Sequence, residues 1–187
     1  MNAYVRSTGG GYQIMCISDA KVMGGSWSDW SGNSNEFSNG THHFKIEVDE
    51  QFVDVLKGFG FDVKWYQKDE AYPGFWFLDI NISWKLRDPE VYVVAHNGVR
   101  TKQTEQTIGD LDGNHNIAFA DMELSASRWE YMGRSGVKPY ASNVYIYLGS
   151  PSSSEQRYQE RFSNVHQPEL PGMPQPALVN DEDDIPF

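Results

Sequence analysis

The sequence has very little cysteine: Cys16 is the only one among 187 residues. A single cysteine cannot form an intrachain disulfide, and it excludes a zinc site built from several cysteines. No apolar run approaches the roughly 20 residues that a transmembrane helix needs. The first residues also lack the basic and then apolar layout of a signal peptide. We therefore expect a cytoplasmic protein that does not enter a membrane.

Basic residues are scarce as well, with 15 Lys and Arg against 26 Asp and Glu, a net charge of −11. The last 38 residues hold seven acidic and two basic residues, a net charge of −5, which leaves −6 for residues 1–149. An acidic protein repels nucleic acid overall. A nucleic-acid partner would therefore require a local basic surface.

Patterns typical of enzymes and of metal sites are missing. The five histidines are scattered without zinc-ligand spacing. Asp110, Asp112 and Asn114 are spaced like the start of a calcium loop, but His115 stands where that loop needs glycine. We interpret this segment as a turn. No acid and base pair and no phosphate-binding loop is evident, so we expect no enzyme activity, no metal and no cofactor.

The residues that are abundant are those of a folded β-protein, with 14% aromatic residues and 17 glycines. Short apolar and alternating segments predict strands, and Asp49 is a plausible N-cap for one short helix that ends at Gly58, with Phe52, Val55 and Leu56 on its apolar face. The predicted strands are residues 11–23, 41–48, 61–66, 76–85, 91–95, 116–129 and 142–148. Many strands without βαβ alternation indicate a mainly β domain over residues 1–149, either a closed antiparallel barrel or a sandwich.

From residue 150 the composition changes to Ser, Pro, Gln and Glu without sustained apolar periodicity. Such a segment cannot offset the entropy cost of its own ordering. We therefore predict that residues 150–187 form a disordered acidic tail, attached to a single folded domain.

Alternation along the strands predicts one outward face that carries rings and ammonium groups. Successive side chains of a strand point to opposite faces, and the inward phase of two strands is assigned to Phe61, Val63, Trp65, Trp76, Leu78, Ile80, Ile82 and Trp84. The outward phase of three strands, taken as adjacent, then includes Lys64, Tyr66, Phe77, Lys85 and Tyr92. Rings between lysines suit a single strand of nucleic acid. Ordinary strand aromatics with solvated lysines would give the same pattern.

A second group of rings and bases lies in the segment "SASRWEYMGRSGVKPY", which is predicted to be a glycine-containing hairpin. Its basic residues Arg128, Arg134 and Lys138 surround the rings of Trp129, Tyr131 and Tyr140. A mobile hairpin of this composition suits closure over a bound strand, and it equally suits a hairpin with a normal charge complement. The Gly/Ser/Asn-rich residues 24–40 carry Trp27 and Trp30 but no Lys or Arg, and are predicted to be a loop too polar for the core.

The chain ends in "DEDDIPF", Asp181 to Phe187, where four carboxylates precede Ile, Pro and Phe. This ending resembles the C-terminal tip of bacterial single-stranded DNA-binding proteins (SSBs). The resemblance implies a partner-docking tip that replication and repair enzymes hold in a pocket. The tip residues are Asp181, Glu182, Asp183, Asp184, Ile185, Pro186 and Phe187.

The body resembles instead a family of phage single-stranded DNA-binding proteins. The resemblance is carried by "GYQIMCISDAKV", "GFDVKW", "TIGDLD" and "GRSGVKPY", which occur in this order between Gly11 and Tyr140. It implies an OB-fold, a five-stranded Greek-key barrel that binds a strand across its outer face and loops. The extra predicted strands and the one short helix would be additions to that barrel.

These features together predict a phage-type SSB that coats single-stranded DNA (ssDNA) largely independently of sequence during replication, recombination and repair, and recruits partners through its tip. The expected DNA contacts are Lys64, Tyr66, Phe77, Lys85, Tyr92, Arg128, Trp129, Arg134 and Lys138. Homo-oligomerisation stays open. The alternatives are a strand-annealing recombination protein and, in another class, a carbohydrate-binding β-module that uses Trp27, Trp30 and Trp76 as sugar platforms.

Overall fold

The structure is a computed structural model that describes residues 1–32, 41–71, 73–85, 88–112 and 116–149. The predicted tail and docking tip, residues 150–187, therefore lie outside the described residues. The strands are β1 Asn2–Ser7, β2 Gln13–Ala20, β3 Val22–Met23, β4 His42–Val48, β5 Lys64–Tyr66, β6 Phe75–Ile82, β7 Glu90–Val94, β8 Arg100–Lys102, β9 Ile117–Tyr131 and β10 Arg134–Leu148. The helical segments are α1 Glu50–Gly58 and the 3₁₀ turns Gly25–Trp27 and Ile108–Leu111.

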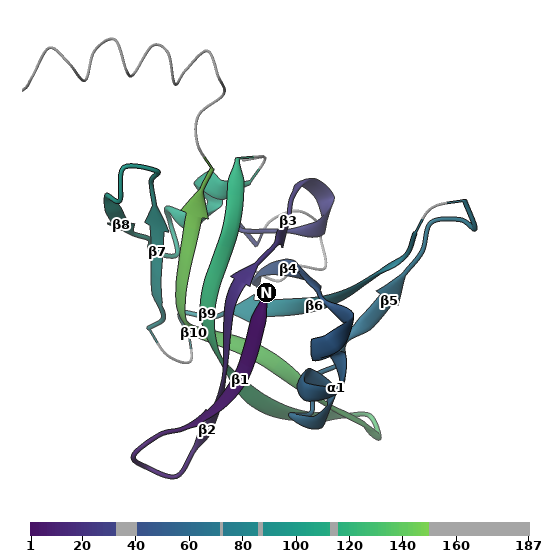
Figure 1. The fold of residues 1–187 in the computed structure, drawn as a ribbon. Coiled ribbons are helices and arrows are strands. Elements are labelled where there is room, and N and C mark those ends of the chain that lie inside the picture. Colours follow the sequence, from purple (N-terminus) through teal and green to yellow (C-terminus); the bar gives the residue numbers. More distant parts are fainter. Residues whose placement is uncertain (33–40, 72, 86–87, 113–115, 150–187) are drawn as a thin grey trace, which may run out of the picture. The chain divides into compact units, whose positions relative to one another are not determined.

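Five strands close into a barrel if β2 and β3 are counted as one bent strand (Figure 1). The sheet order is β1-β2-β9-β10-β6-β4-β3. Only Lys21 separates β2 from β3, and this one bent path pairs with β9 through β2 and with β4 through β3. The order therefore returns to its start. The predicted fold class is confirmed: the described residues form a mainly β, OB-type barrel with one α-helix.

The barrel is closed unevenly. β4–β6, β9–β10 and β2–β9 are antiparallel ladders, whereas β6 and β10 run parallel and pair only at Asn81 and Tyr140. The Asn81 side-chain amide also donates to the Pro139 carbonyl at 3.3 Å. We call this junction the β6–β10 seam. Three additions lie outside the barrel (Figure 1). β1 pairs with β2 and extends the sheet, and β5 pairs with the first residues of β6 to form a projecting arm. β7 pairs with β10 on one side and with β8 on the other.

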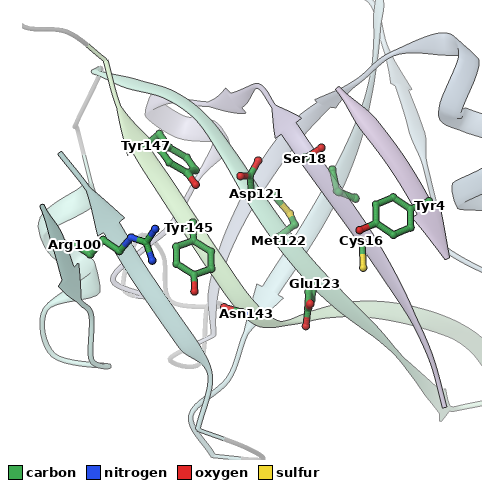
Figure 2. Close-up of a pocket in the computed structure, with 11 residues that line it drawn as sticks. Tyr4, Cys16, Ser18, Arg100, Asp121, Met122, Glu123, Asn143, Tyr145 and Tyr147 are labelled. Atoms are coloured by element: carbon green, nitrogen blue, oxygen red, sulfur yellow. The ribbon is translucent and has the colours of Figure 1, made fainter. Parts of the chain in front are cut away.

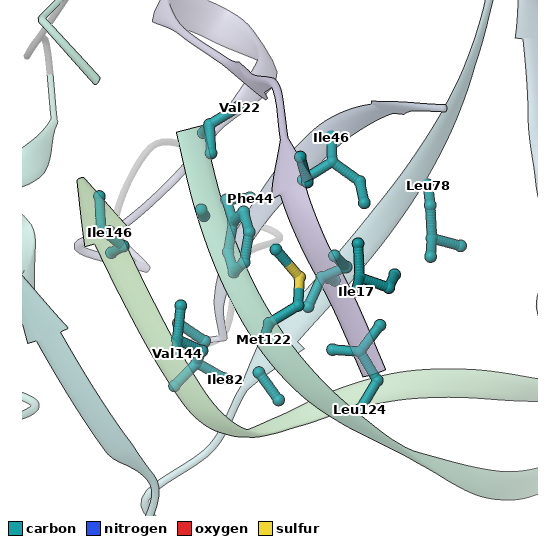
Figure 3. Close-up of a cluster of buried hydrophobic side chains, with 14 of the residues drawn as sticks. Ile17, Val22, Phe44, Ile46, Leu78, Ile82, Met122, Leu124, Val144 and Ile146 are labelled. Carbon is teal, nitrogen blue, oxygen red and sulfur yellow. The ribbon is translucent and has the colours of Figure 1, made fainter. Parts of the chain in front are cut away.

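The core follows from the alternation of apolar residues along the barrel strands (Figure 3). Leu78, Ile80 and Ile82 of β6 are almost fully buried, which confirms the predicted inward phase of that strand. Phe44 and Ile46 of β4 are buried beside them. They meet the inward residues of β2, β9 and β10. The barrel interior is therefore filled by side chains.

The loop after β3 does not match its predicted exclusion from the core. Trp30 is 2% exposed and stacks on Phe44 with 4.6 Å between ring centroids. Its backbone N–H donates to the Asp112 carboxylate at 2.8 Å, and its carbonyl oxygen accepts from His42 Nδ1 at 2.6 Å. The prediction is wrong here because one large ring outweighs the polarity of its neighbours. Asp112, which the sequence placed in a turn, thus anchors this loop.

Two further residues were assigned to the wrong environment. Val55 of α1 is 41% exposed, because the helix buries Val53 in its place, beside the correctly predicted Leu56. Trp65 is 49% exposed although its phase within β5 is inward. Since β5 pairs only with β6 and lies outside the barrel, no core covers that side of it, and Trp65 packs against Trp76 at 5.1 Å.

Strands β1 and β8 were not predicted from the sequence. Both are short, lie at sheet edges and are mostly exposed, so they carry little of the apolar alternation that identifies a strand. β10 also starts at Arg134, eight residues earlier than predicted. The added length makes β9 and β10 a long hairpin that reaches past the barrel (Figure 1).

Candidate nucleic-acid interface

The outward faces of β4, β5 and β6 form one continuous surface. Lys64 lies opposite Phe77 in the β5–β6 ladder, and Tyr66 lies opposite Phe75. On the other side of β6, Lys45 of β4 lies opposite Asp79. Three of the predicted contact residues, Lys64, Tyr66 and Phe77, therefore share a face.

An aromatic cluster occupies the arm end of this surface. Trp27 makes edge-on contacts with Tyr66, Phe75 and Phe77, at centroid distances of 4.9, 5.7 and 5.5 Å. Lys45 holds Trp27 in place. Its Nζ donates to the Trp27 carbonyl oxygen at 3.1 Å and lies 6.0 Å from the centroid of the Trp27 ring. The sequence left Trp27 in an unplaced loop, and its partners became visible only once the loop was folded back onto β6.

A groove of about 520 Å³ begins beside Lys64 and runs between β6 and the β9–β10 hairpin. It brings together three predicted residues that are far apart in the sequence: Lys64, Trp129 and Lys138. The full lining is Gly60, Asp62, Lys64, Asp79, Asn81, Trp129, Ser135, Gly136, Val137, Lys138 and Pro139. We call it the barrel groove.

The charges in the barrel groove are mixed. Asp62 lies 3.5 Å from Lys64, and Asp79 lies 4.0 Å from Lys45, so both acids have a lysine beside them. Lys138 has no ion-pair partner among the described residues. The buried Oδ1 of Asp79 also lacks a hydrogen-bond partner there. The groove therefore offers a free cation and an unsatisfied acceptor.

Two smaller hollows continue along β6 and β10 past the seam. One, of about 50 Å³, is lined by Lys85, Ser83 and Tyr140 among others. The other, of about 280 Å³, shares Ser83 and Tyr140 and is rich in serine. Lys85 thus stands at the end of β6 opposite to Lys64.

Arg128 and Arg134 lie on the β9–β10 hairpin beside the barrel groove. Arg128 pairs with Val137, and Arg134 pairs with Tyr131 next to the turn at Met132 and Gly133. Both arginines are exposed, and neither forms an ion pair within the described part of the chain. Five predicted cations therefore border the barrel groove, its hairpin wall or its continuation.

A family described as a putative phage ssDNA-binding domain matches residues 11–171, a stretch that includes the whole barrel, the barrel groove and the hairpin. The chain belongs to this family.

Solved structures similar to this member of the phage ssDNA-binding family are distant in sequence. The single-stranded DNA-binding protein of bacteriophage Enc34 in complex with ssDNA is 9% identical, with a TM-score of 0.48, over 74% of this chain and 88% of that one. A second structure of the single-stranded DNA-binding protein of bacteriophage Enc34 is 9% identical, with a TM-score of 0.46, over 84% of this chain and 96% of that one. The single-stranded DNA-binding protein gp2.5 of bacteriophage T7 is 10% identical, with a TM-score of 0.36, over 83% of this chain and 97% of that one. No curated protein matches significantly.

Tyr92 lies apart from the other predicted DNA contacts. β7 pairs with β10 and β8, not with β5 or β6, so the expected adjacency of three strands is wrong. Tyr92 stacks on Tyr145 at 5.3 Å and donates to the Glu90 carboxylate at 2.6 Å. Lys102 donates to the same carboxylate, and these hydrogen bonds lower the pKa of Glu90. The error arose because strand order cannot be read from chain order.

Gly136 is the position on which the ring of Trp129 rests. A Cβ atom at residue 136 would lie 2.8 Å from Trp129 Nε1 and 2.9 Å from two ring carbons. We expect Gly136→Ala to displace the ring and to weaken binding of an oligothymidine by roughly the worth of one stacked base, ~1–3 kcal/mol. Unchanged affinity with an unchanged Trp129 emission spectrum would contradict this expectation. Gly133→Ala at the hairpin turn is a less well matched control, because residue 133 has a positive φ of 73° and alanine there would add backbone strain.

No group of three or more His, Cys, Asp or Glu side chains among the described residues is arranged to hold a metal ion. None of the helices described is long and apolar enough to cross a membrane.

Proposed function

We propose that this protein binds ssDNA along the outer face of β5 and β6, through the barrel groove and under the β9–β10 hairpin. Family membership supports the ligand class, and the meeting of Lys64, Trp129 and Lys138 in one groove carries the placement. An OB-fold binds oligonucleotides on this part of the barrel and on the adjoining loops.

The proposed contacts divide into stacking and charge. Bases stack on the exposed parts of Tyr66 and Phe77 and on Trp129, each worth ~1–3 kcal/mol. The phosphates are neutralised by Lys64, Lys85, Arg128, Arg134 and Lys138. Every base has a face to stack on, so binding along this route is largely independent of sequence. Tyr92 belongs to a different surface and is not included in this route.

The experiment that tests this proposal is a titration with oligothymidine at several salt concentrations, followed by tryptophan fluorescence. We expect quenching, with log K falling linearly in log salt with a slope of about −3.5 if five phosphates are neutralised. Trp129→Phe should keep most of the affinity but lose part of the quenching. Quenching by an oligosaccharide alone would overturn the proposal.

The fold disfavours the carbohydrate-binding alternative but not the strand-annealing one. Trp30 is buried beneath its loop, and Lys57 lies 4.5 Å over the ring of Trp76, so two of the three expected sugar platforms are occupied by the protein itself. A strand-annealing protein would use the same groove. Acceleration of duplex formation between two complementary oligonucleotides would favour that alternative over simple coating.

We further propose that the protein coats ssDNA during phage replication, recombination and repair in the host cytoplasm. The tip of the tail would recruit partner enzymes, with the side chains of Ile185 and Phe187 filling a pocket on the partner. Burial of these two side chains offers ~1.5–3 kcal/mol each, reduced by the cost of ordering the tail. The expected contact is therefore weak, with a dissociation constant in the micromolar range.

The acidic tip should also compete with DNA for the basic side chains of the barrel groove. Deletion of residues 181–187 removes four carboxylates next to one another and should tighten oligothymidine binding, most clearly at low salt, because screening suppresses the competition at high salt. Filter binding over a salt series measures the effect. A truncated chain with the same affinity and the same salt dependence as the full chain would exclude the competition.

A further inference from the structure

A further hollow, of about 400 Å³, lies on the outward face of β2, β9 and β10 (Figure 2). It shares no lining residue with the barrel groove. Tyr4 of β1 stands at one rim, and Arg100 of β8 and Tyr145 of β10 stand at the other (Figure 2). The volume is within the range of small-ligand sites, ~300–1,000 Å³. We call this hollow the tyrosine hollow.

Aromatic rings border the tyrosine hollow and are held in place by their neighbours. Tyr145 stacks on Tyr92 at 5.3 Å, and Tyr147 stacks on Phe119 at 4.5 Å, each pair within about 21° of parallel. These contacts fix the rings before any ligand arrives, so little conformational entropy is lost when a planar group enters beside them. Tyr4 at the opposite rim is 58% exposed.

Arg100 supplies a cation at the rim. Its guanidinium lies 5.5 Å from the centroid of the Tyr145 ring, an arrangement that holds a cation by the negative face of the ring. No carboxylate pairs with Arg100 among the described residues. A positioned guanidinium without a partner is suited to a phosphate, which it can bind through two parallel hydrogen bonds.

The two carboxylates of the hollow are already engaged. Glu123 accepts from the guanidinium of Arg6, and Asp121 accepts from the backbone N–H of Asp19 at 2.9 Å. The phenol of Tyr147 donates to Asp121, and burial, and secondly the Asp121 charge, raise the pKa of Tyr147. Arg6 therefore offsets one acid and neutral donors stabilise the other, which leaves Arg100 free to attract an anion.

The floor of the hollow holds an acceptor without a donor. Oδ1 of Asn143 is buried and has no hydrogen-bond partner within the described part of the chain. A buried acceptor of this kind is unfavourable until a donor reaches it. Asp121 also lines the hollow and has lone pairs beyond those that its partners use. A ligand with N–H donors would satisfy both side chains.

We propose that the tyrosine hollow binds a single nucleotide, with its phosphate on Arg100, its base against the ring of Tyr145, and the N–H groups of the base on Asn143 and Asp121. Guanine fits this arrangement best, because its Watson–Crick edge presents both an imino and an amino donor. Thymine presents one N–H between two carbonyl oxygens, and those oxygens would face the acceptors of the site. The hollow is thus a base-selective contact, in contrast to the barrel groove.

The test uses free nucleotides, so it does not depend on strand binding in the barrel groove. Calorimetric titration of the full chain should give one site for deoxyguanosine monophosphate, with deoxythymidine monophosphate at least about fivefold weaker. Arg100→Ala should weaken the guanine nucleotide about tenfold. Asn143→Leu should reduce the preference for guanine over thymine. Lys57→Ala, on α1 and outside both the tyrosine hollow and the barrel groove, should change the binding of neither nucleotide.

Several outcomes would overturn the proposal. These are the absence of binding at millimolar nucleotide, affinity that Arg100→Ala leaves unchanged, and equal binding of inorganic phosphate and the guanine nucleotide. Binding of an arginine-rich peptide at this site, lost in Asp121→Asn, would assign the hollow to a cationic partner instead. Arg100 lies on an exposed edge strand, so Arg100→Ala should unfold at the temperature of the unmodified protein, and Arg100→Lys provides a second variant that keeps the charge.

Discussion

Reversing the charge of Lys64 and Lys138 together is expected to weaken oligothymidine binding about 100-fold at low salt, on the estimate of about tenfold for each lost phosphate contact. Both lysines line the barrel groove, from opposite sides: one on β5 and one on β10. Loss of two phosphate contacts should also reduce the slope of log K against log salt by about 1.4. Fluorescence titration of Lys64→Glu/Lys138→Glu at three salt concentrations gives both quantities.

A matched control separates the groove from net charge. Lys57→Glu/Lys102→Glu changes the total charge by the same amount, but Lys57 lies on α1 and Lys102 on β8, and neither lines the barrel groove. We expect this control to lose at most a few-fold in affinity, through long-range repulsion that salt screens. Equal losses in the two double variants would contradict the placement of DNA in the barrel groove.

Trp30→Ala is expected to lower the free energy of unfolding by ~3–5 kcal/mol, the usual cost of removing a large buried ring. Trp30 packs flat on Phe44 inside the barrel, and the two hydrogen bonds of its backbone tie the loop to Asp112 and His42. Truncation of the ring leaves a cavity at this junction. Urea denaturation monitored by circular dichroism measures the change in free energy.

Trp129→Ala is the comparison for the effect on stability. Trp129 is 39% exposed on the hairpin, beyond the barrel, so its removal should cost less than ~1 kcal/mol of stability while it weakens DNA binding. The two tryptophans are thus expected to have opposite profiles, with Trp30 required for folding and Trp129 for binding. A similar loss of stability in both variants would contradict this division of roles.

The parts of this fold that the sequence predicted are those that local periodicity determines. Phe44 and Ile46 alternate with polar residues, and the strand that contains them is buried on one face only, so their direction follows from period two. The same rule failed at Trp65, because membership of the barrel is not a local property. The exposed side of β5 depends on which strands lie beyond it, and the sequence does not contain that information locally.

The candidate sites divide in the same way. Lys64, Phe77 and Trp129 were found because rings and bases interleave within short segments, but their meeting in one groove required the pairing of β6 with β10. The tyrosine hollow was missed. Tyr145 and Tyr147 alternate with the buried Val144 and Ile146, a signal that was present in the sequence, whereas Arg100 comes from a three-residue edge strand that gives almost none.

The β6–β10 seam has a consequence for the energetics of the whole barrel. The wall is joined there by one pair of residues, Asn81 and Tyr140, and the barrel groove reaches that junction at Asn81 and Pro139. A DNA strand that contacts Lys64 on one side and Lys138 on the other would bridge the part of the wall that is joined by a single residue pair. Each bound strand should therefore raise the melting temperature and slow amide exchange at the seam, so that occupancy of the groove and integrity of the barrel reinforce each other.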